Sequence, residues 1–197
     1  MVNKENNNIP WSVFTASFLR HLGVRHACIS PGARNSPLTF AFTEHSKIKC
    51  FSHVDERSSA FFALGLAKST QNPVVLISTS GTAPANFYPA VIEASLSRVP
   101  LIILSADRPA YLIGTGANQT IDQQNLYGNH VRHFTDMGLP KDNKESLHDH
   151  LFTAFQHSSG LKLEEPPGPV HLNFPFDKPL LPEKITDIIP PPFTFEN

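Results

Sequence analysis

Four short segments of the chain gather side chains that could do chemistry. They are residues 30–36 (SPGARNS), 53–57 (HVDER), 78–86 (STSGTAPAN) and 106–109 (ADRP). Each follows an apolar run that predicts a β-strand, and a glutamate there can exchange a proton while arginines can bind carboxylates. The side chains that turns alone would not require are Arg34, Glu56, Thr82, Arg108 and Asn118. Four of them lie in these segments and Asn118 follows in the loop after the last one, so their accumulation predicts a site.

The elements that position these segments alternate between strand and helix. Apolar runs predict six strands, at residues 26–29, 48–54, 74–78, 101–104, 131–134 and 170–174. Apolar residues at helical spacing predict helices at 11–22, 36–45, 57–67, 85–96 and 147–155. In the second of these, Ser36 is expected as the N-cap and Pro37 in the first turn. Nearly continuous apolar strands separated by helices indicate an α/β fold: a six-stranded parallel sheet with helices on both faces, in a Rossmann-like, three-layer arrangement. Ligands of such sheets bind beyond the carboxyl ends of the strands.

Composition excludes several classes of function. A net charge of -1 in 197 residues provides no basic stripe for nucleic acid or an anionic membrane. The polar N-terminus does not resemble a signal peptide, and no apolar run reaches the roughly 20 residues of a membrane span. Cys28 and Cys50 lie in apolar segments and are expected to be buried free thiols. We therefore expect a cytoplasmic protein without an integral membrane segment.

Three weaker motifs do not carry a function. Residues 114–119 lack the third glycine of a dinucleotide fingerprint, because Gln119 stands in its place. Ser80 lacks the glycine two residues earlier that a nucleophile elbow requires. Two histidine pairs lack cysteine or carboxylate partners at ligand spacing, so no metal ligand is predicted in this chain. These pairs are His130/His133 and His148/His150.

Longer phrases around the four segments resemble thiamine diphosphate enzymes. Glu56 at a strand end, followed by the helix AFFALGLA, resembles their cofactor-activating segment. Within that superfamily, four phrases resemble the N-terminal pyrimidine-binding (Pyr) domain of the 2-succinyl-5-enolpyruvyl-6-hydroxy-3-cyclohexene-1-carboxylate (SEPHCHC) synthase family of menaquinone biosynthesis. They are ISPGARNSPL, HVDERSSAFFALGLAKST, TSGTAPANFYPAVIEA and ADRPAYLIGTGANQTIDQ. The resemblance covers roughly residues 11–175 and departs at Ala33, where the family usually has Ser.

The resemblance implies a transferase that decarboxylates 2-oxoglutarate and adds the resulting carbanion to isochorismate. Glu56 is then the catalytic residue, because a carboxylate against N1′ of the aminopyrimidine favours the imino tautomer that activates the cofactor. The alternative is that Glu56 is only a first-turn acid that compensates the helix dipole. The resemblance assigns thiamine diphosphate to Pro31, Glu56, Ser80, Gly81, Thr82, Asn86 and Gln119.

The resemblance assigns the substrate to four residues. Both substrates are carboxylates, which Arg34 and Arg108 suit as planar, bidentate donors. The alternative for each arginine is a structural salt bridge. Asn118 and Gln119 resemble residues that reach the substrate and the cofactor intermediate, and their alternative is turn chemistry.

Thiamine diphosphate enzymes hold the diphosphate and Mg²⁺, or a substitute such as Mn²⁺, through a Gly-Asp-Gly segment that this sequence does not contain. We expect residues 1–175 to form the Pyr domain. Half of the 18 prolines follow Glu165, so residues 176–197 are expected to be a linker towards a further domain. The resemblance implies that the enzyme continues past Asn197, and that these residues alone are inactive.

The resemblance also implies a homodimer or homotetramer formed through the Pyr domain. Phe61 and Phe62 are adjacent on the predicted helix 57–67 and cannot both be buried on one face, so one is expected in a subunit interface. Two alternatives stay open. The chain could be the small subunit of a split thiamine diphosphate 2-oxo acid decarboxylase, or a non-catalytic module for dimerisation or carboxylate binding.

Overall fold

The computed structural model describes residues 7–141, 143–161 and 165–181. Within these residues, six parallel strands form one sheet in the order β2-β1-β3-β4-β6-β5. In chain order the strands are β1 (His26–Ile29), β2 (Lys49–Ser52), β3 (Val74–Ser78), β4 (Leu101–Asp107), β5 (His133–Asp136) and β6 (Pro169–Pro175). The expected α/β fold with a six-stranded parallel sheet is confirmed.

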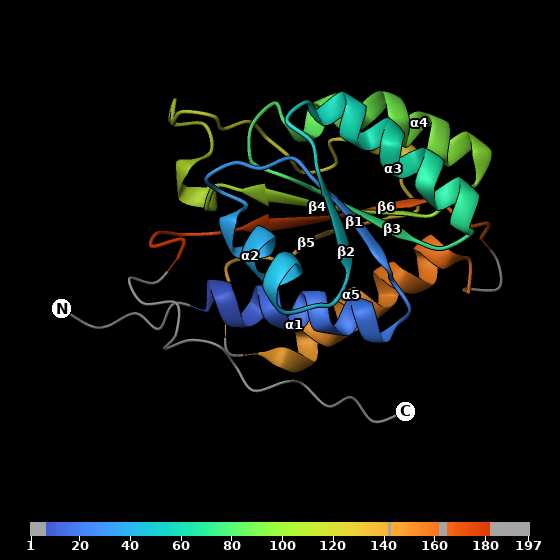
Figure 1. Ribbon diagram of the computed structural model, residues 1–197. Helices are drawn as coiled ribbons and strands as arrows, with labels where there is room; N and C mark the ends of the chain where they lie inside the picture. Colours follow the sequence, from blue (N-terminus) through green and yellow to red (C-terminus); the bar gives the residue numbers. More distant parts are fainter. Residues whose placement is uncertain (1–6, 142, 162–164, 182–197) are drawn as a thin grey trace.

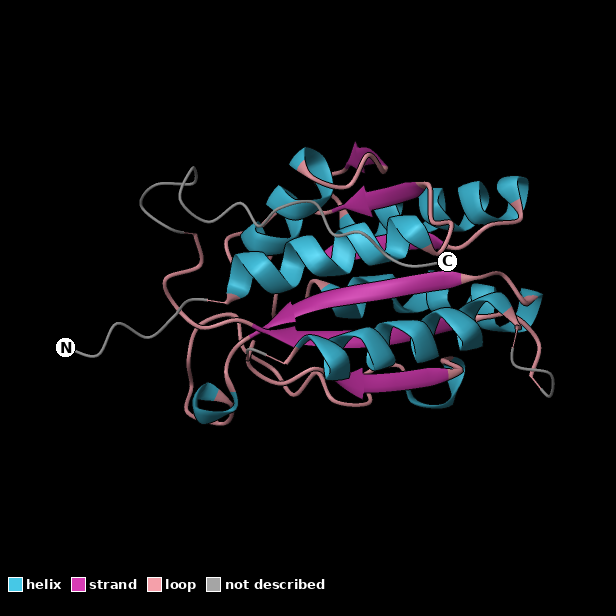
Figure 2. Cartoon of the chain, turned by 90° about the horizontal axis from the view of Figure 1, so that it is seen from below, coloured by secondary structure: helices cyan, strands magenta, loops and turns pink. Residues whose placement is uncertain are grey.

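Helices cover both faces of this sheet (Figure 1). On one face lie α1 (Asn8–His21), α2 (Ser36–Glu44) and α5 (Lys144–Ser159), and on the other lie α3 (Glu56–Thr70) and α4 (Tyr88–Ser97). Figure 2, seen from the side of α1 and α5, shows helices crossing in front of the strands. No helix in the described part of the chain is both long and apolar enough to cross a bilayer.

The core has two layers because successive strand residues point to opposite faces. In β3, Val75 and Ile77 pack with α1, α2 and α5, whereas Val74 and Leu76 pack with α3 and α4. All four are fully buried or nearly so, as are their neighbours in β4. The central strands are therefore apolar on both faces, as expected for a parallel sheet.

The same alternation separates the two cysteines. Cys28 in β1 packs in the layer of α3 and α4, and Cys50 in β2 packs against the layer of α1, α2 and α5. Both are free thiols; Cys28 is buried, whereas Cys50 is only partly buried. Burial raises the pKa of Cys28 to about 12 and the pKa of Cys50 to about 11. Both thiols are therefore protonated, and poorly nucleophilic, at neutral pH.

Several strand ends differ from the predicted ones. β2 stops at Ser52, opposite Ile29, because β1 is its only neighbour among the described strands. β4 continues three residues beyond 104, because β6 pairs with it as far as Asp107. β5 begins at His133 rather than at residue 131. Pairing with neighbours, which apolar runs do not encode, sets these boundaries.

Helix starts also differ from the prediction, and α1 and α5 each begin three residues earlier than expected, at Asn8 and Lys144. Ser36 is the first residue of α2 and not its N-cap, because Asn35 precedes it and folds the turn through bonds from Gly32 N (2.8 Å) and to Ser30 O (2.9 Å). The helix predicted from residue 85 begins as a 3₁₀ helix, η1 (Pro84–Phe87), and becomes α4 at Tyr88. Two further 3₁₀ turns are η2 (Ala110–Leu112) and η3 (Gly128–His130).

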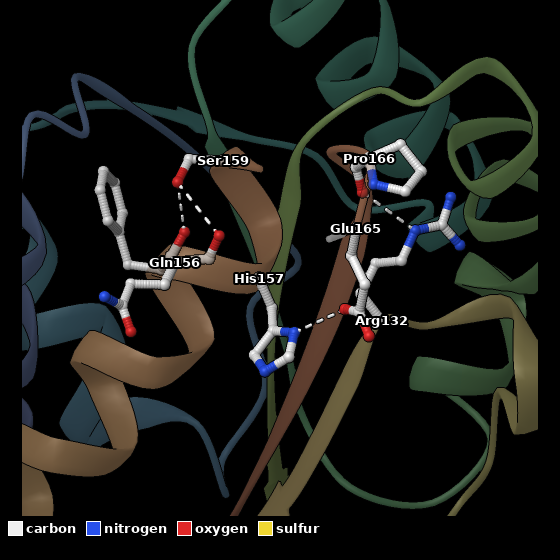
Figure 3. A network of polar contacts seen from close by, with 7 residues as sticks. Arg132, Gln156, His157, Ser159, Glu165 and Pro166 are labelled. Atoms are coloured by element: carbon white, nitrogen blue, oxygen red, sulfur yellow. Dashed lines mark hydrogen bonds and ion pairs between the residues drawn. The ribbon is translucent and has the colours of Figure 1, made fainter. Parts of the chain in front are cut away.

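Glu165 and Pro166, shortly before β6, are held from two sides (Figure 3). His157 Nδ1 lies 2.8 Å from a carboxylate oxygen of Glu165. Arg132 donates from Nε to the carbonyl of Pro166 (3.3 Å). Its Nη2 donates to the carbonyl of Ser95 in α4 (2.7 Å). β6 therefore starts from a position tied to both helical layers.

The segment after β6 lies against the domain as far as the structure describes it. Phe176 is fully buried and its N–H donates to Asp107 O at 3.1 Å. Asn8 donates to the carbonyls of Asp177 (2.8 Å) and Pro179 (3.1 Å). Residues 176–181 thus pack on the start of α1, and the rest of the expected linker lies outside the described residues.

Candidate functional site

The turns after β1 and β3 touch at the carboxyl edge of the sheet. A Cβ atom on Gly32 would lie 2.5 Å from the Cβ of Thr79, closer than two such atoms can approach. Gly81 lies similarly close to Gln119, whose Cγ would be 2.9 Å from an added Cβ. Gly81 also has φ +85°, which favours glycine. Glycine is therefore required at both positions for the turns to pack together.

Reciprocal hydrogen bonds join Ser80 to Gln119. Ser80 Oγ donates to Gln119 O at 3.0 Å, and Gln119 Nε2 donates to Ser80 O at 3.1 Å. Gln119, rather than Asn118, adopts the left-handed conformation, with φ 55°. Asn118 is exposed, and its carbonyl accepts a hydrogen bond from Arg108 Nη2 at 3.0 Å. The loop after β4 is thus attached both to the β3 turn and to Arg108.

Thr82 and Asn86 continue the β3 turn on its exposed side. Asn86 Nδ2 donates to Thr82 O at 3.2 Å, within the turn that leads into η1. η1 packs against α3, the helix that begins with Glu56. Pro31 is exposed and helps to line an open groove of about 500 Å³ along α2.

Glu56 is the first residue of α3 and is half-buried. The preceding Asp55 caps the helix by accepting a hydrogen bond from Ser58 N at 2.7 Å. The side chain of Ser58, and then its backbone N–H, lower the pKa of Asp55. No hydrogen bond or ion pair of Glu56 is found in the part of the chain that the structure describes. Asp55 therefore performs the capping role, and the Glu56 carboxylate is not used by the fold there.

Neither candidate arginine forms a salt bridge within residues 7–141, 143–161 and 165–181. The side chain of Arg34 is 4% exposed; its Nη1 donates to Phe176 O at 2.6 Å and its Nε is buried without a partner. Arg108 is half-buried, and its Nε is also buried without a partner. The ion pairs in these ranges are instead His148–Asp149 and His157–Glu165. The alternative of a structural salt bridge is therefore not found in this part of the chain.

The structure joins some of the predicted residues directly and others only through their elements. Ser80, Gly81, Gln119, Asn118 and Arg108 form one bonded group at the ends of β3 and β4. Pro31 adjoins this group through the contact of the next residue with Thr79. Arg34 and Glu56 lie on loops and helix starts at the same edge, without a hydrogen bond to the group.

A buried polar network beneath this group was missed by sequence analysis. Asn173 in β6 donates from Nδ2 to the carboxylates of Asp107 (2.9 Å) and Asp136 (3.2 Å). Its Oδ1 accepts from Ser105 Oγ (2.9 Å) and Gln123 Nε2 (2.9 Å). The sequence does contain a signal for this network, because polar residues interrupt otherwise apolar strands in residues 104–107 (LSAD) and 171–174 (HLNF).

Burial shifts two ionisable groups of this network. The pKa of Asp107 is raised to about 6, chiefly by burial, although bonds from Asn173 and the Arg108 N–H act in the opposite direction. The pKa of His171 is lowered to about 3 by burial, so its ring is neutral at physiological pH. His171 Nε2 lies 2.7 Å from Ser105 Oγ. No group of three or more His, Cys, Asp or Glu residues that could hold a metal ion occurs among the described residues.

Comparison with known proteins assigns the chain to a family. Residues 13–126 match the family described as thiamine pyrophosphate enzyme, N-terminal TPP binding domain. Thiamine pyrophosphate is another name for thiamine diphosphate. The chain therefore belongs to the thiamine diphosphate enzymes, through their N-terminal domain.

Individual proteins that are similar to most of the chain share one name, 2-succinyl-5-enolpyruvyl-6-hydroxy-3-cyclohexene-1-carboxylate synthase. The protein of Haloquadratum walsbyi is 50% identical over 98% of this chain and 31% of its own length. That of Listeria innocua is 50% identical over 92% of this chain and 31% of its own length. That of Halobacterium salinarum is 47% identical over 95% of this chain and 32% of its own length. The chain spans about a third of the length of these curated relatives.

Replacing Asp107 by Asn should change how stability depends on pH. Because the pKa of Asp107 is about 6 in the fold and 3.8 as its ordinary value, the folded state holds this proton more tightly than the unfolded state. The stability contributed by the protonated acid is present below about pH 4 and lost as pH rises through 6. Relative to Asp107→Asn, the wild-type free energy of unfolding should therefore fall between about pH 4 and pH 6 and then level off.

Urea unfolding followed by the fluorescence of Trp11 measures this difference. Glu44→Gln is the matched control, because Glu44 is exposed and its loss should leave the wild-type pH dependence unchanged. A difference between wild type and Asp107→Asn that stays constant from pH 4 to pH 7 would contradict the assignment.

Proposed function

We propose that this chain forms the pyrimidine-binding part of a SEPHCHC synthase. In the reaction, the bond between C1 and C2 of 2-oxoglutarate breaks with loss of carbon dioxide, and C2 then forms a bond to isochorismate. The names of the relatives and the four phrases at the carboxyl edge support this activity. Because the chain covers about a third of those relatives, we propose that these 197 residues alone do not catalyse the reaction.

The observation that carries the proposal is the lack of carboxylate partners for two arginines. Arg34 and Arg108 each have a buried Nε without a hydrogen-bond partner, and neither forms an ion pair in the described ranges. A guanidinium taken out of water is costly unless an anion pairs with it. Both proposed substrates carry carboxylates, which could pair with these donors in bidentate geometry.

Glu56 suits the role of cofactor activation. Bound thiamine diphosphate supplies the carbon nucleophile that attacks a 2-oxo acid. Glu56 would accept and return the proton shared with the ring nitrogen of the aminopyrimidine. Three features support this role: the carboxylate is half-buried, no hydrogen bond of the described fold engages it, and it lies at the helix N-terminus, whose dipole stabilises negative charge.

The bonded group at the ends of β3 and β4 would hold the rest of the pyrimidine and the substrate. We assign the cofactor to Pro31, Ser80, Gly81, Thr82, Asn86 and Gln119, and the substrate to Arg34, Arg108, Asn118 and Gln119. The exposed position of Thr82, Asn86 and Asn118 leaves their polar atoms accessible to a ligand. We propose that Mg²⁺, or Mn²⁺ in its place, and the diphosphate are held mainly outside this chain.

Two further features of the proposal concern location and domain organisation. The free thiols of Cys28 and Cys50 support a reducing, cytoplasmic compartment. We propose that residues 1–175 form the Pyr domain and that residues 176–197 lead towards another domain. The names of the relatives favour this organisation over a split decarboxylase subunit or a non-catalytic module.

We propose a homodimer or homotetramer that uses the outer face of α3. Phe61 and Phe62 are 42% and 43% exposed, and Phe61 lines a cavity of about 450 Å³ with Arg57, Ser58 and Pro89. Exposed aromatic side chains next to a cavity favour association. Sedimentation of the wild type should therefore show dimers or tetramers, and Phe61→Ser should shift the equilibrium towards the monomer. A wild type that stays monomeric at high concentration would exclude this assembly.

Replacing Glu56 by Gln should reduce the turnover of 2-oxoglutarate and isochorismate by roughly 10² to 10⁴, because a proton-transfer partner is lost. The measurement is steady-state kinetics on the complete protein that contains this chain. Glu93→Gln is the control, because Glu93 is exposed on α4 and should leave the rate unchanged. Activity of Glu56→Gln within tenfold of the wild type would reject Glu56 as the activating residue.

Replacing Arg108 by Met should lower kcat/KM for a carboxylate substrate by roughly 10- to 100-fold, as expected for losing a hydrogen bond to a charged group. The Michaelis constants of 2-oxoglutarate and isochorismate, measured separately, identify the substrate that Arg108 contacts. Arg98→Met is the control, since Arg98 is exposed after α4 at the opposite edge of the sheet. Unchanged kinetics for both substrates would remove Arg108 from the site.

A further inference from the structure

We propose that Gln123 is a positioning residue whose buried side-chain amide fixes the Gly81 turn of the site. The proposal rests on the proposed function in one respect, namely that this turn contacts the cofactor. Gln123 lies in the connection between β4 and β5, and its side chain would not itself touch a ligand because it is fully buried.

The Gln123 amide connects three parts of the fold. Its Oε1 accepts a hydrogen bond from the backbone N–H of Gly81 at 2.8 Å. Its Nε2 donates to Asn173 Oδ1 in β6 at 2.9 Å and to Ala106 O in β4 at 3.3 Å. A single side chain therefore fixes the β3 turn relative to the carboxyl ends of β4 and β6.

The chemistry of the network allows one orientation of this amide. The carboxylates of Asp107 and Asp136 accept, so the NH₂ group of Asn173 must face them. Asn173 Oδ1 then faces Gln123 and must accept a hydrogen bond, which Gln123 Nε2 donates. The remaining oxygen of Gln123 faces the Gly81 N–H, which can only donate. The series of hydrogen bonds that runs from Gly81 through Gln123 and Asn173 to Asp107 can therefore form with only one orientation of the two amide groups.

Ser105 and His171 complete this arrangement. Ser105 has one hydroxyl proton, which goes to Asn173 Oδ1, so His171 Nε2 must donate to the Ser105 oxygen. His171 is then a neutral ring with its proton on Nε2. His171 Nδ1 is buried without a partner, as expected if it carries no proton. The same orientation of Asn173, and hence of Gln123, is therefore favoured from a second direction.

The Gly81 turn depends on the hydrogen bond from the Gly81 N–H to Gln123 Oε1 more than an ordinary turn would. Gly81 is buried and its N–H points to the buried Gln123 side chain, so solvent cannot satisfy it. Ser80 and Gln119 bond to each other beside Gly81, and the Gly81 Cα lies against the Gln119 side chain. A shift of Gly81 would therefore move two residues assigned to the cofactor.

A methionine of similar shape could fill the space of Gln123 but would not define the turn. It would leave the buried Gly81 N–H and Asn173 Oδ1 without this partner. The three bonds of the Gln123 amide fix the position of the turn, which an apolar side chain cannot do.

The contact is tested first in the full 197-residue chain by NMR. In the wild type, a scalar coupling across the hydrogen bond should connect the Gly81 nitrogen to the Gln123 side-chain carbonyl carbon. In Gln123→Met, amide exchange of Gly81 should be at least about tenfold faster, the factor equivalent to 1.4 kcal/mol. Exchange of Gly32, whose N–H donates to the Asn35 side chain at 2.8 Å, should stay unchanged.

Gln124→Met is the matched variant, because Gln124 is the neighbouring glutamine, is exposed and makes one long side-chain bond of 3.4 Å. It should leave Gly81 exchange at the wild-type rate. Absence of the coupling in the wild type would overturn the proposal even if Gln123→Met does not fold. Unchanged Gly81 exchange in a folded Gln123→Met would overturn it as well.

The consequence for the site is tested by kinetics of the complete protein. Gln123→Met should raise the KM for thiamine diphosphate by about tenfold or more, whereas Gln124→Met should not. A merely structural role would lower Tm and the active fraction but leave this KM unchanged, and that result would reject positioning. If the wild type shows no activity dependent on thiamine diphosphate, the proposed function fails, while the Gly81 coupling and exchange still decide the role of Gln123 in the turn.

Discussion

Every polar group buried at the carboxyl ends of β4 and β6 needs a hydrogen-bond partner, and this requirement links the sheet to its candidate site. Asp107 and Asn173 lie opposite Pro175 and Ser105 in the register of these strands, inside a layer that excludes water. Unpaired, each would cost stability comparable to a lost hydrogen bond or more. Asn173 donates to Asp107, and Gln123, which reaches inward from a loop, donates to Asn173 and accepts from the Gly81 N–H. The position of the turn therefore follows from the need to satisfy the core.

The sheet itself could be predicted from the sequence because its pattern is local. Apolar runs of four to seven residues marked all six strands, and β1 and β3 match their expected ranges, since strands in the middle of a parallel sheet are buried on both faces. The start of α3 was predicted to within one residue, because two acids, Asp55 and Glu56, precede a helical pattern. Boundaries that depend on a neighbouring strand, such as the end of β4 at Asp107, could not be predicted from the sequence.

The site could be predicted only in part, for the same reason. Ser80, Gly81 and Gln119 belong to recognisable phrases, and the structure brings them into direct contact. Gln123 lies in a stretch without helical or strand periodicity, and its burial depends on Asn173, 50 residues further along the chain. The environment of Arg34 depends on Phe176, 142 residues away, so its burial could not be inferred from its own turn. Long-range polar contacts leave little trace in a single sequence.

Charge explains why this edge is suited to ligands even though the chain as a whole is nearly neutral. The net charge of -1 gives no long-range attraction, so recognition must come from local groups. Two guanidinium groups lack carboxylate partners among the described residues, while a carboxylate at a helix start is left free by the capping role of Asp55. Cations without counter-ions favour anionic ligands, and an acid that the fold does not use is available for proton transfer. The Gln123 network thus satisfies the buried groups of Asn173 and the Gly81 N–H, whereas Arg34, Arg108 and Glu56 have no partner of opposite charge among the described residues. These are the charges that a carboxylate and an aminopyrimidine could complement.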